Sequence, residues 1–385
     1  MGLRPSLCKI CNFAGMLRAG ILGGGQLGRM LIQAAIDLDL KVHVLDSAPD
    51  SPCAGIAHHF RVGSVREADT VERFAAEVQL LTIELEEVSV EGMQRAAAKG
   101  VQVAPAPEIV ALLQDKGRQR TWYAEHGFPS PRFQVWQPGE PVHLPFPLIQ
   151  KSRRGGYDGR GVQRVTDPTA LWPVPSLLEE LVPIAKEISV LVARSRRGEV
   201  RAFPPVEAVF HPQAHVVEYL RIPADLPPEA AQEAQALAQD LAESLGMVGL
   251  LAVELFYTPQ GQLYLNESAP RPHNTGHVTV KACWTSQFEQ HWRALLNFPL
   301  GDTRVHTPAG LVNILGPEGQ HGRVAFPTLP ELLALPGTSV HLYGKRRSSP
   351  YRKLGHILVL VEDPAQLPVR IAEVRHRLRL EVYPD

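Results

Sequence analysis

Strand-like and helix-like segments alternate along residues 18–115, and this alternation limits the fold more than any other feature of the sequence. Short apolar runs such as RAGIL and KVHVLD are each followed by a longer amphipathic run, such as LGRMLIQAAIDL or VREADTVERFAAEV. Strands that alternate with helices return to one sheet in a parallel direction. The pattern therefore predicts one α/β domain over 18–115, with a parallel sheet and helical crossovers.

The rest of the 385-residue chain follows another pattern, and a chain of this length is expected to form two or three domains. Residues 116–300 combine β-rich pieces such as EISVLVARSRRGEVRAF with the helix-like PPEAAQEAQALAQDLAESLG and SQFEQHWRALLNF, which indicates an α+β domain. Residues 301–385 hold three short strand-like segments and the helix-like AQLPVRIAEVRHRL, enough for a small β-rich domain. Residues 1–17 fit neither pattern and are expected to be a disordered extension.

The composition is that of a globular protein and excludes several classes of function. Hydrophobic residues make up 44% and charged residues 21% of the chain, and the formal net charge is −1. This balance argues against a basic nucleic-acid binder, and apolar runs such as MVGLLAVELF are too short to span a membrane. We expect a cytoplasmic protein that binds neither nucleic acid nor membrane. Cys8 and Cys11 form a CxxC pair without a second pair, so an incidental spacing is favoured over a redox or metal site.

Gly23, Gly25 and Gly28 form a G-x-G-x-x-G cluster between the first strand-like run and the first helix-like run. Asp46 ends the next strand-like run, near the place of the ribose-binding acid in a dinucleotide-binding domain. The same turn also serves other phosphorylated or carboxylated ligands, and Gln26 would place an amide where pyrophosphate should lie. Another ligand is therefore favoured over a dinucleotide and over a purely structural turn.

A second glycine-rich segment, KSRRGGYDGRG at 151–161, contains four cationic side chains. Its backbone N–H groups can close over a polyphosphate while Lys151 supplies a fixed positive charge. The order G-x-x-x-x-G-K-[ST] of a Walker loop is absent. We predict a phosphate-binding loop of another kind, and the alternative is a solvated basic hairpin.

The segment VELFYTPQGQLYLNE can form a hairpin that turns at Gln260 and Gly261. In that register Glu254 lies directly opposite Glu267, and like charges opposite each other destabilise a sheet. Two carboxylates held together share a proton or bind a cation, and the neighbouring Asn266 adds an oxygen ligand suited to Mg²⁺. A Mg²⁺ site beside a phosphate loop predicts ATP; the alternative is another register with solvated glutamates.

Eight motifs follow one another from about residue 18 to residue 360: GGGQLGRM, QDK, KSRRGGYDGRG, VELF, NESAPRPHNTGH, SQFEQHWRALLNFPLG, VNILG and YRKLGH. In this order they resemble the N5-carboxyaminoimidazole ribonucleotide synthetases, a family of ATP-grasp ligases of purine biosynthesis. The motif NESAPRPHNTGH followed by SQFE is highly specific, whereas the spacing of the first glycines is common to many folds.

The resemblance implies an architecture, a reaction and an assembly. The fold would be α/β and α+β, with a Rossmann-like N-terminal domain (18–115), a central ATP-grasp domain (116–300) and a small β-rich C-terminal domain (301–385), usually in a homodimer. ATP would phosphorylate bicarbonate to carboxyphosphate, and the exocyclic amine of 5-aminoimidazole ribonucleotide would then be carboxylated. One or two Mg²⁺ ions would accompany ATP, and no biotin would take part.

Matching positions in the motifs imply the nucleotide side of the site. Glu254 and Glu267 resemble the Mg²⁺ ligands, in agreement with the hairpin argument. Glu187 resembles a ribose-binding acid. Residues 179–182 resemble the strip that binds adenine through backbone groups, and residues 156–161 resemble a flap over the phosphates. The implied ATP-binding set is Lys116, Lys151, Gly156, Tyr157, Asp158, Gly159, Arg160, Gly161, Glu179, Glu180, Leu181, Val182, Glu187, His211, Asn266 and Glu267.

The resemblance implies the carboxylation side in the same way. Arg271 suits bicarbonate and the charge of carboxyphosphate because its guanidinium is a planar fork. His273 and Asn274 would orient that intermediate or the amine, and they complete a catalytic set with Arg271 and Lys151. His277 is interpreted as structural. The implied ribonucleotide-binding residues are Gln26, Glu84, Tyr157 and Asp158 at the base and ribose, and Lys345 and Arg352 at the 5′-phosphate.

The sequence departs from the family pattern at a few positions that concern affinity rather than the reaction. Lys116 stands where Arg is common, Val162 where Gln often follows the flap, Ala208 where Asn is common, and Thr275 where Ser is usual. Three alternatives remain open. They are another ATP-grasp ligase, such as a formate-dependent glycinamide ribonucleotide transformylase or a biotin carboxylase, an NAD-dependent dehydrogenase, and a catalytically silent scaffold subunit.

Overall fold

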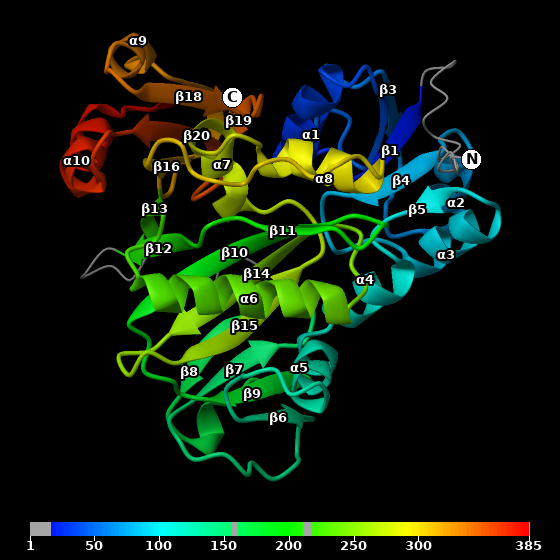
Figure 1. The fold of residues 1–385 in the computed structure, drawn as a ribbon, viewed down its shortest axis with the longest axis vertical. Helices are drawn as coiled ribbons and strands as arrows, with labels where there is room; N and C mark the ends of the chain where they lie inside the picture. Colours follow the sequence, from blue (N-terminus) through cyan, green and yellow to red (C-terminus); the bar gives the residue numbers. More distant parts are fainter. Residues whose placement is uncertain (1–16, 156–160, 211–216, 385) are drawn as a thin grey trace, which may run out of the picture.

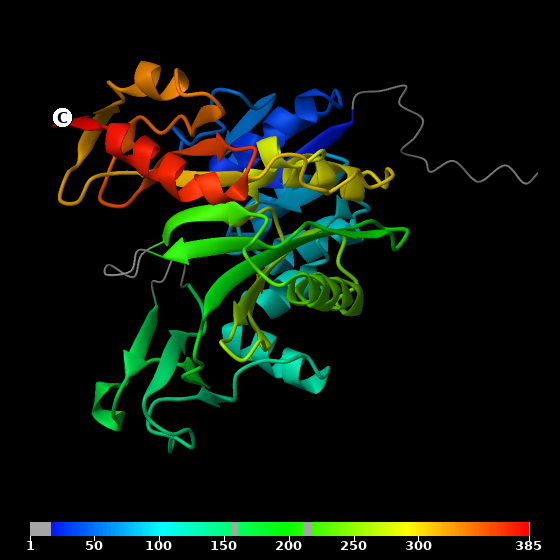
Figure 2. The same cartoon turned by 60° about the vertical axis from the view of Figure 1, so that its left-hand side comes forward.

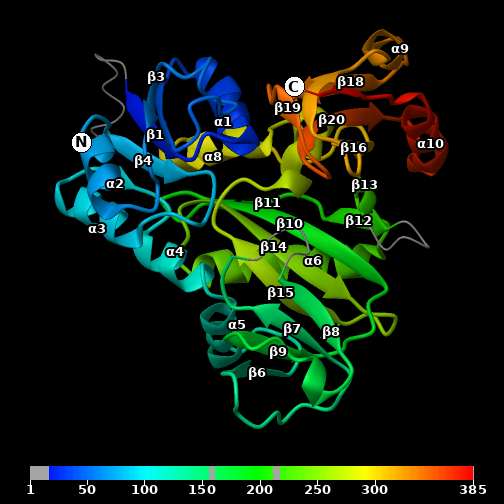
Figure 3. The same cartoon turned by 180° about the vertical axis from the view of Figure 1, so that it is seen from behind.

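A computed structural model describes residues 17–155, 161–210 and 217–384. The N-terminal parallel sheet and the C-terminal strands lie side by side at one end of the molecule, and the small sheet with β6 and β9 lies at the other end (Figures 1 and 3). Among the described residues, no helix is long and apolar enough to cross a membrane. Residues 1–16 lie outside the described residues, so the disorder expected for 1–17 stays a prediction.

The N-terminal region forms the predicted parallel sheet, in the order β3-β2-β1-β4-β5. The sequence pattern does not reveal β3, because this short edge strand is at most half-buried and its residues HFRV lack a clear alternation. The elements are β1 (Arg18–Leu22), α1 (Gln26–Ile36), β2 (Lys41–Asp46), β3 (His59–Val62), α2 (Ala68–Ala75), β4 (Leu80–Ile83), α3 (Val90–Ala98), β5 (Gln102–Val103) and α4 (Pro107–Leu113).

Two antiparallel sheets form the central region. The smaller has the order β6-β9-β7-β8, and the larger begins with the hairpin of β15 and β14. The elements are α5 (Lys116–Glu125), β6 (Phe133–Trp136), β7 (Leu148–Ser152), β8 (Val162–Val165), η2 (Pro168–Ala170), β9 (Ser176–Glu180), β10 (Lys186–Arg194), β11 (Val200–Ala202), β12 (Val206–Phe210), β13 (Val217–Ile222), α6 (Pro228–Ser244), β14 (Gly249–Tyr257) and β15 (Leu263–Ala269).

The C-terminal strands continue the central sheet instead of forming a separate one. Strand β13 pairs with β16, so the hydrogen-bonded order runs β15-β14-β10-β12-β13-β16-β20-β18. In Figure 2 the green strands of the central region lie directly below the orange and red C-terminal region. A further small sheet has the order β19-β17-β21. The elements are η3 (Asn274–Val278), α7 (Thr279–Ala282), α8 (Gln287–Leu295), β16 (Ala309–Leu315), β17 (Gly322–Ala325), α9 (Leu329–Leu333), β18 (Thr338–Leu342), β19 (Arg347–Ser348), β20 (Lys353–Leu360), η4 (Pro364–Gln366), α10 (Leu367–Arg377) and β21 (Glu381–Tyr383).

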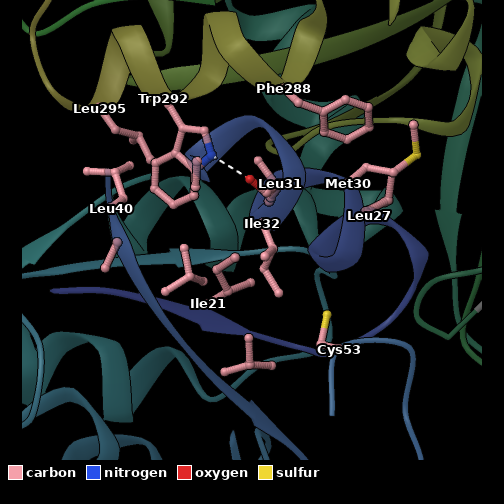
Figure 4. Packing of buried hydrophobic residues seen from close by; sticks show 14 of the residues in the cluster. Ile21, Leu27, Met30, Leu31, Ile32, Leu40, Cys53, Phe288, Trp292 and Leu295 are labelled. Atoms are coloured by element: carbon pink, nitrogen blue, oxygen red, sulfur yellow. Dashed lines mark hydrogen bonds between the residues drawn. The ribbon is translucent and has the colours of Figure 1, made fainter. Parts of the chain in front are cut away.

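Helix α8 joins the central region to the N-terminal sheet. Its side chains Phe288, Trp292 and Leu295 share one buried cluster with Leu31 and other residues of α1 (Figure 4). The indole Nε1 of Trp292 donates to the carbonyl of Leu31 at 2.8 Å. This packing fixes the start of α1, with its glycine turn, relative to the segment that leads from β15 into α8.

Candidate active site

The hairpin of β14 and β15 brings the two predicted metal ligands together. Glu254 pairs with Glu267, as predicted, and the chain turns at Gly261, whose φ is +83°. The register shifts beside Glu254, where Asn266 is the extra residue of a bulge. Asn266 Nδ2 donates to Glu254 Oε2 at 3.3 Å. Three oxygen-bearing side chains therefore gather at one end of the hairpin.

Two lysines from other elements face this carboxylate pair. Lys116 begins α5 and contacts a carboxylate oxygen of Glu267 through Nζ. Lys151 on β7 is 7% exposed, and its Nζ donates to Asn266 Oδ1 at 2.7 Å. A site with paired carboxylates and adjacent ammonium groups has the charge pattern that a metal-bound polyphosphate requires.

Burial shifts the pKa values of these groups. It raises the pKa of Glu254, although the charge of Lys116 and the amide of Asn266 act in the opposite direction. Burial and the charge of Lys151 lower the pKa of Lys116 to about 8. Burial and the charge of Glu254 raise the pKa of Glu187 on β10 to about 7. A bound cation would relieve the repulsion among these carboxylates.

The donor set at the hairpin fits part of a Mg²⁺ shell. Within the described ranges, no group of three or more His, Cys, Asp and Glu side chains has the arrangement of a metal site. Glu254, Glu267 and Asn266 offer oxygen ligands, which Mg²⁺ prefers, and Mg²⁺ usually takes its other ligands from water and phosphate oxygens. The residues therefore suit an ion that arrives with a nucleotide better than a permanently caged one.

Gln287 at the start of α8 fixes the segment that follows β15. Its Oε1 accepts from the backbone N–H of His273 at 2.9 Å, and its Nε2 donates to the carbonyl of the same residue at 2.7 Å. His273 Nε2 lies 3.5 Å from Glu254 Oε1. Burial and the charge of Arg271 lower the pKa of His273 to about 3. The ring is therefore neutral near pH 7, and its contact with Glu254 is not an ion pair.

Arg271 contacts a carboxylate that the sequence analysis did not include. Its Nη2 pairs with Glu86 Oε1 at 2.7 Å, and its Nη1 donates to the carbonyl of Pro272 at 2.9 Å. Glu86 follows β4, so a residue of the N-terminal region holds the arginine predicted to bind bicarbonate. The available signal for Glu86 was its place just beyond the carboxyl end of a buried parallel strand, where ligand-facing residues collect.

Gln26, Asn274 and Lys345 form a hydrogen-bonded chain across three regions of the molecule. Gln26 Nε2 donates to Asn274 Oδ1 at 3.1 Å, and Lys345 Nζ donates to Gln26 Oε1 at 2.7 Å. The structure therefore brings together residues predicted for the ribonucleotide and for catalysis. Arg352, the predicted partner of Lys345 at the phosphate, is exposed and donates to the carbonyl of Arg347 at 3.0 Å.

The protein's own carboxylates occupy the glycine turn, residues 23–28. Glu84, which is 8% exposed, accepts from two backbone N–H groups of this turn at 2.9 Å each. Asp46 accepts from a third at 2.7 Å. A dinucleotide would need these N–H groups for its pyrophosphate and Asp46 for its ribose. The turn therefore lacks the free donors of an NAD site, and Glu84 supports the turn that presents Gln26.

The strand end predicted to read adenine lies beside the two lysines. Strand β9 ends at Glu180, and of the two residues that follow, Leu181 is exposed and Val182 half-buried. The preceding Glu179 is buried, and its carboxylate contacts Lys151 and Arg120. Arg120 was not predicted, because nothing in the sequence distinguishes it from an exposed helix residue.

The remaining predicted positions are His277, the end of the flap, and six residues that the structure does not describe. His277 is buried, and its ring stacks on that of His356 with centroids 5.0 Å apart, which supports the structural interpretation. Gly161, the last residue of the predicted flap, has φ +77°, a conformation that favours glycine. Six predicted residues lie outside the described residues: Gly156, Tyr157, Asp158, Gly159, Arg160 and His211.

Comparison with known proteins decides the family. Family models match residues 16–114 (ribonucleotide synthetase preATP-grasp domain), 121–288 (ATP-grasp domain) and 309–369 (phosphoribosylaminoimidazole carboxylase C-terminal domain). The N5-carboxyaminoimidazole ribonucleotide synthase of Mycobacterium tuberculosis H37Rv is 40% identical over 374 residues, which cover 93% of this chain and 87% of that protein. The chain belongs to the N5-carboxyaminoimidazole ribonucleotide synthase family. It is an ATP-grasp ligase.

Other members of the synthase family agree in sequence and fold. The chloroplastic phosphoribosylaminoimidazole carboxylase of Vigna aconitifolia is 37% identical, and the match covers 92% of this chain and 66% of that protein. The synthetase from Thermotoga maritima superimposes with a TM-score of 0.87 at 34% identity, covering 96% of this chain and all of that one. A synthase from Aspergillus clavatus, solved with ADP and 5-aminoimidazole ribonucleotide, has a TM-score of 0.84 at 29% identity. The match covers 94% of this chain and 98% of that one.

Membership of the synthase family removes the main rival explanations. An NAD-dependent dehydrogenase was suggested only by the first glycine cluster and Asp46. A backbone N–H group of the glycine turn donates to the Asp46 carboxylate, so neither group is free for a dinucleotide. The three matching family models, in order, also separate this chain from biotin carboxylases and from the formate-dependent transformylases.

Proposed function

We propose that the protein carboxylates 5-aminoimidazole ribonucleotide to N5-carboxyaminoimidazole ribonucleotide, using ATP and bicarbonate and releasing ADP and phosphate. The arrangement around His273 is the observation that supports this most. Its ring contacts Glu254 of the nucleotide half, and the adjacent Asn274 bonds Gln26 of the acceptor half. A ligase that links ATP chemistry to a ribonucleotide needs both halves in one site.

The first proposed step is phosphoryl transfer. A bicarbonate oxygen attacks the γ-phosphorus, a new O–P bond forms, the bond to the ADP oxygen breaks, and carboxyphosphate results. Lys116 and Lys151 would hold the phosphates in line for this attack, and their contacts with Glu267 and Asn266 support this role. Mg²⁺ held by Glu254 and Glu267 would supply further neutralisation of phosphate charge. Catalysis at this step is positioning and charge compensation rather than proton transfer.

The second proposed step joins the carboxyl group to the amine. The exocyclic nitrogen attacks the carboxyl carbon, the C–N bond forms, the C–O bond to phosphate breaks, and the amine loses a proton. Arg271 would stabilise the charge on the carboxyl oxygens after exchanging Glu86 for the substrate. His273, with its pKa lowered to about 3, is a hydrogen-bond partner rather than a base near neutral pH. The leaving phosphate is the base that the reaction itself supplies.

The ribonucleotide is proposed to lie along the chain of Gln26, Asn274 and Lys345. Gln26, with Tyr157 and Asp158, would bind the ribose and base, and Glu84 would act through the turn that presents Gln26, because N–H groups of that turn already bond its carboxylate. Lys345 with Arg352 would bind the 5′-phosphate. The support is that Lys345 already bonds Gln26 across the gap between the N-terminal and C-terminal regions. A homodimer and a cytoplasmic location are the corresponding expectations for assembly and place.

One assay tests the function as a whole. ADP release from ATP and bicarbonate is measured with and without 5-aminoimidazole ribonucleotide, and the carboxylated product is trapped and identified. We expect strong stimulation by the ribonucleotide and one ADP per product. ADP release that ignores the ribonucleotide, or that depends on formate or biotin, would contradict the substrate assignment.

A further inference from the structure

Strand β15 lies at the edge of the large sheet, and helix α5 packs along its outer side (Figure 1). An edge strand has backbone N–H and C=O groups that no neighbouring strand satisfies. Because the bulge at Asn266 shifts the alternation, these outward groups include the carbonyls of Leu265 and Asn266 and both backbone groups of Ser268. Side chains of α5 bond all of them.

Helix α5 makes these contacts from positions spaced i, i+3, i+4 and i+7, which share one helix face. Lys116 contacts Glu267, and Gln119 bonds the N–H of Ser268 at 3.1 Å and its carbonyl at 3.3 Å. Tyr123, at the last of these positions, donates its hydroxyl to Ser268 Oγ at 2.7 Å. The buried face of this helix is therefore mostly polar, and it is complementary to one stretch of strand backbone.

Arg120 makes the central contacts of this face. Its side chain is 1% exposed, and its two terminal nitrogens donate to the carbonyls of Leu265 and Asn266, the latter at 2.8 Å. One of these nitrogens also pairs with Glu179, whose side chain is 3% exposed. Glu179 uses its other oxygen to bind Lys151 Nζ at 2.7 Å. Glu179 thus connects Arg120, which is bonded to β15, with Lys151 of the smaller sheet.

The contacts close into a ring, because Lys151 returns to β15 through its 2.7 Å bond to Asn266 Oδ1. Burial alone would raise the pKa of Glu179, but the charges of Lys151 and Arg120 outweigh burial and lower it. The carboxylate is therefore charged near neutral pH. Removal of either partner would leave an uncompensated buried charge.

We propose that Arg120 and Glu179 are positioning residues that hold Lys151 in register with the carboxylates of the β14–β15 hairpin. This inference rests on the proposed function, because it explains how the same site aligns the phosphates of ATP. Arg120 suits this task because its planar guanidinium spreads the donors for two carbonyls and a carboxylate over two terminal nitrogens, whereas a lysine would have to reach all three from one nitrogen. Misplacement of reacting groups by about 1 Å costs roughly a hundredfold in rate.

The test compares Arg120→Lys and Arg120→Met with Arg118→Met, a matched control on the exposed side of the same helix. The full-length enzyme is assayed at varied ATP, Mg²⁺ and ribonucleotide, and melting temperatures are recorded. We expect kcat to fall about tenfold in Arg120→Lys and about a hundredfold in Arg120→Met. The half-saturating Mg²⁺ concentration should rise, the KM for the ribonucleotide should stay constant, and Arg118→Met should match the wild type.

A purely structural role for Arg120 gives a different result. Both variants would then melt earlier but keep the wild-type kcat and Mg²⁺ dependence below their melting temperatures, and that result would overturn the inference. If Arg120→Met does not fold, Arg120→Lys decides the question, because it keeps a positive charge beside Glu179. Glu179→Gln keeps the size of the side chain and should raise the KM for ATP as well as lower kcat.

Binding of Mg·ADP separates this inference from the proposed function. It is measured by titration calorimetry and needs neither bicarbonate nor the ribonucleotide. If the wild type ignores the ribonucleotide while Arg120→Lys binds Mg·ADP several-fold more weakly, the proposed function fails and the positioning role stands. If the wild type is active and Arg120→Lys keeps both kcat and Mg·ADP affinity, the positioning role alone is wrong.

Discussion

The glycine turn at the start of α1 and the end of the β14–β15 hairpin each bring two acidic side chains together, but the partners of those acids differ. At the turn, Glu84 and Asp46 accept hydrogen bonds from backbone N–H groups. At the hairpin, Glu254 and Glu267 pair across the two strands, and their partners are side chains: Asn266 of the same hairpin for Glu254, and Lys116 of α5 for Glu267. The first pair is satisfied by the fold itself, and the second leaves coordination sites for a ligand.

This difference shows that acidic residues near a ligand-type motif can have opposite purposes. The turn resembles a phosphate site in sequence, yet internal carboxylates already occupy the donors that a phosphate would use. The hairpin carries no familiar cofactor motif, yet its register places two carboxylates together, and such a pair can bind a cation. Function follows from which groups remain unsatisfied, and substitutions in the two regions should therefore separate activity from stability.

The largest expected effect comes from Glu267→Gln at the hairpin. The variant keeps the shape of the side chain but loses a carboxylate ligand, so we expect kcat to fall by roughly 10²- to 10³-fold. The half-saturating Mg²⁺ concentration should rise in the same ADP-release assay. Glu229→Gln, at an exposed position of α6, is the control. Unchanged turnover with an unchanged Mg²⁺ requirement would show that the hairpin is not the metal site.

The next largest effect is expected at the glycine turn, where Glu84→Gln should lower the stability of the protein. The amide can accept from one N–H of the turn but directs its own N–H₂ toward the other, which leaves a buried donor unsatisfied at a cost of about 2 kcal/mol. We expect the melting temperature to fall by several degrees. Glu254→Gln, by contrast, replaces a carboxylate whose pKa is raised by burial with a neutral side chain, and it should melt at or above the wild-type temperature. Equal destabilisation of both variants would remove the distinction between the two regions.

Sequence periodicity was enough to predict the features that depend on local patterns. The alternation over 18–115 predicted a parallel sheet, and the turn at Gly261 predicted that Glu254 lies opposite Glu267. Both succeed because a strand has a fixed two-residue repeat and a hairpin fixes its own register. The bulge at Asn266 could not be predicted, because either strand of a hairpin can accommodate an extra residue.

The rest of the site depends on contacts between distant segments. The segment KGRQRTWYAE of α5 shows no apolar stripe, so its buried face cannot be recognised from hydrophobic periodicity. Its partner is the backbone of β15, and Arg120 lies 145 residues away from Leu265 in the sequence. Backbone groups carry no residue-specific signal. For the same reason, the pairing of β13 with β16 was not foreseen; the segment of β16 was recognised as strand-like, but that of β13 was not.

A smaller effect, which depends on the pH, tests whether the positive charge of Lys116 beside the hairpin binds a negatively charged ligand. Burial and Lys151 lower the pKa of Lys116 to about 8. Above that pH the free enzyme loses this positive charge, so kcat/KM for ATP should fall about five- to tenfold between pH 7.5 and pH 9. Lys116→Arg keeps its charge throughout this range and should abolish the fall. A parallel decline in both enzymes would assign the titration to another group.

The smallest expected effect concerns Glu187, whose pKa is raised to about 7 by burial and by the charge of Glu254. Between about pH 4.5 and pH 7 the folded protein keeps a proton that the unfolded chain releases, so this residue lowers stability as pH rises through that window. Glu187→Gln removes the penalty and should melt on the order of 2 °C above the wild type at pH 8, with no gain at pH 4. Differential scanning calorimetry at both pH values measures this, with the exposed Glu362→Gln as the control. A gain of the same size at both pH values would mean that packing sets the stability at this position, rather than the burial of the Glu187 charge near Glu254.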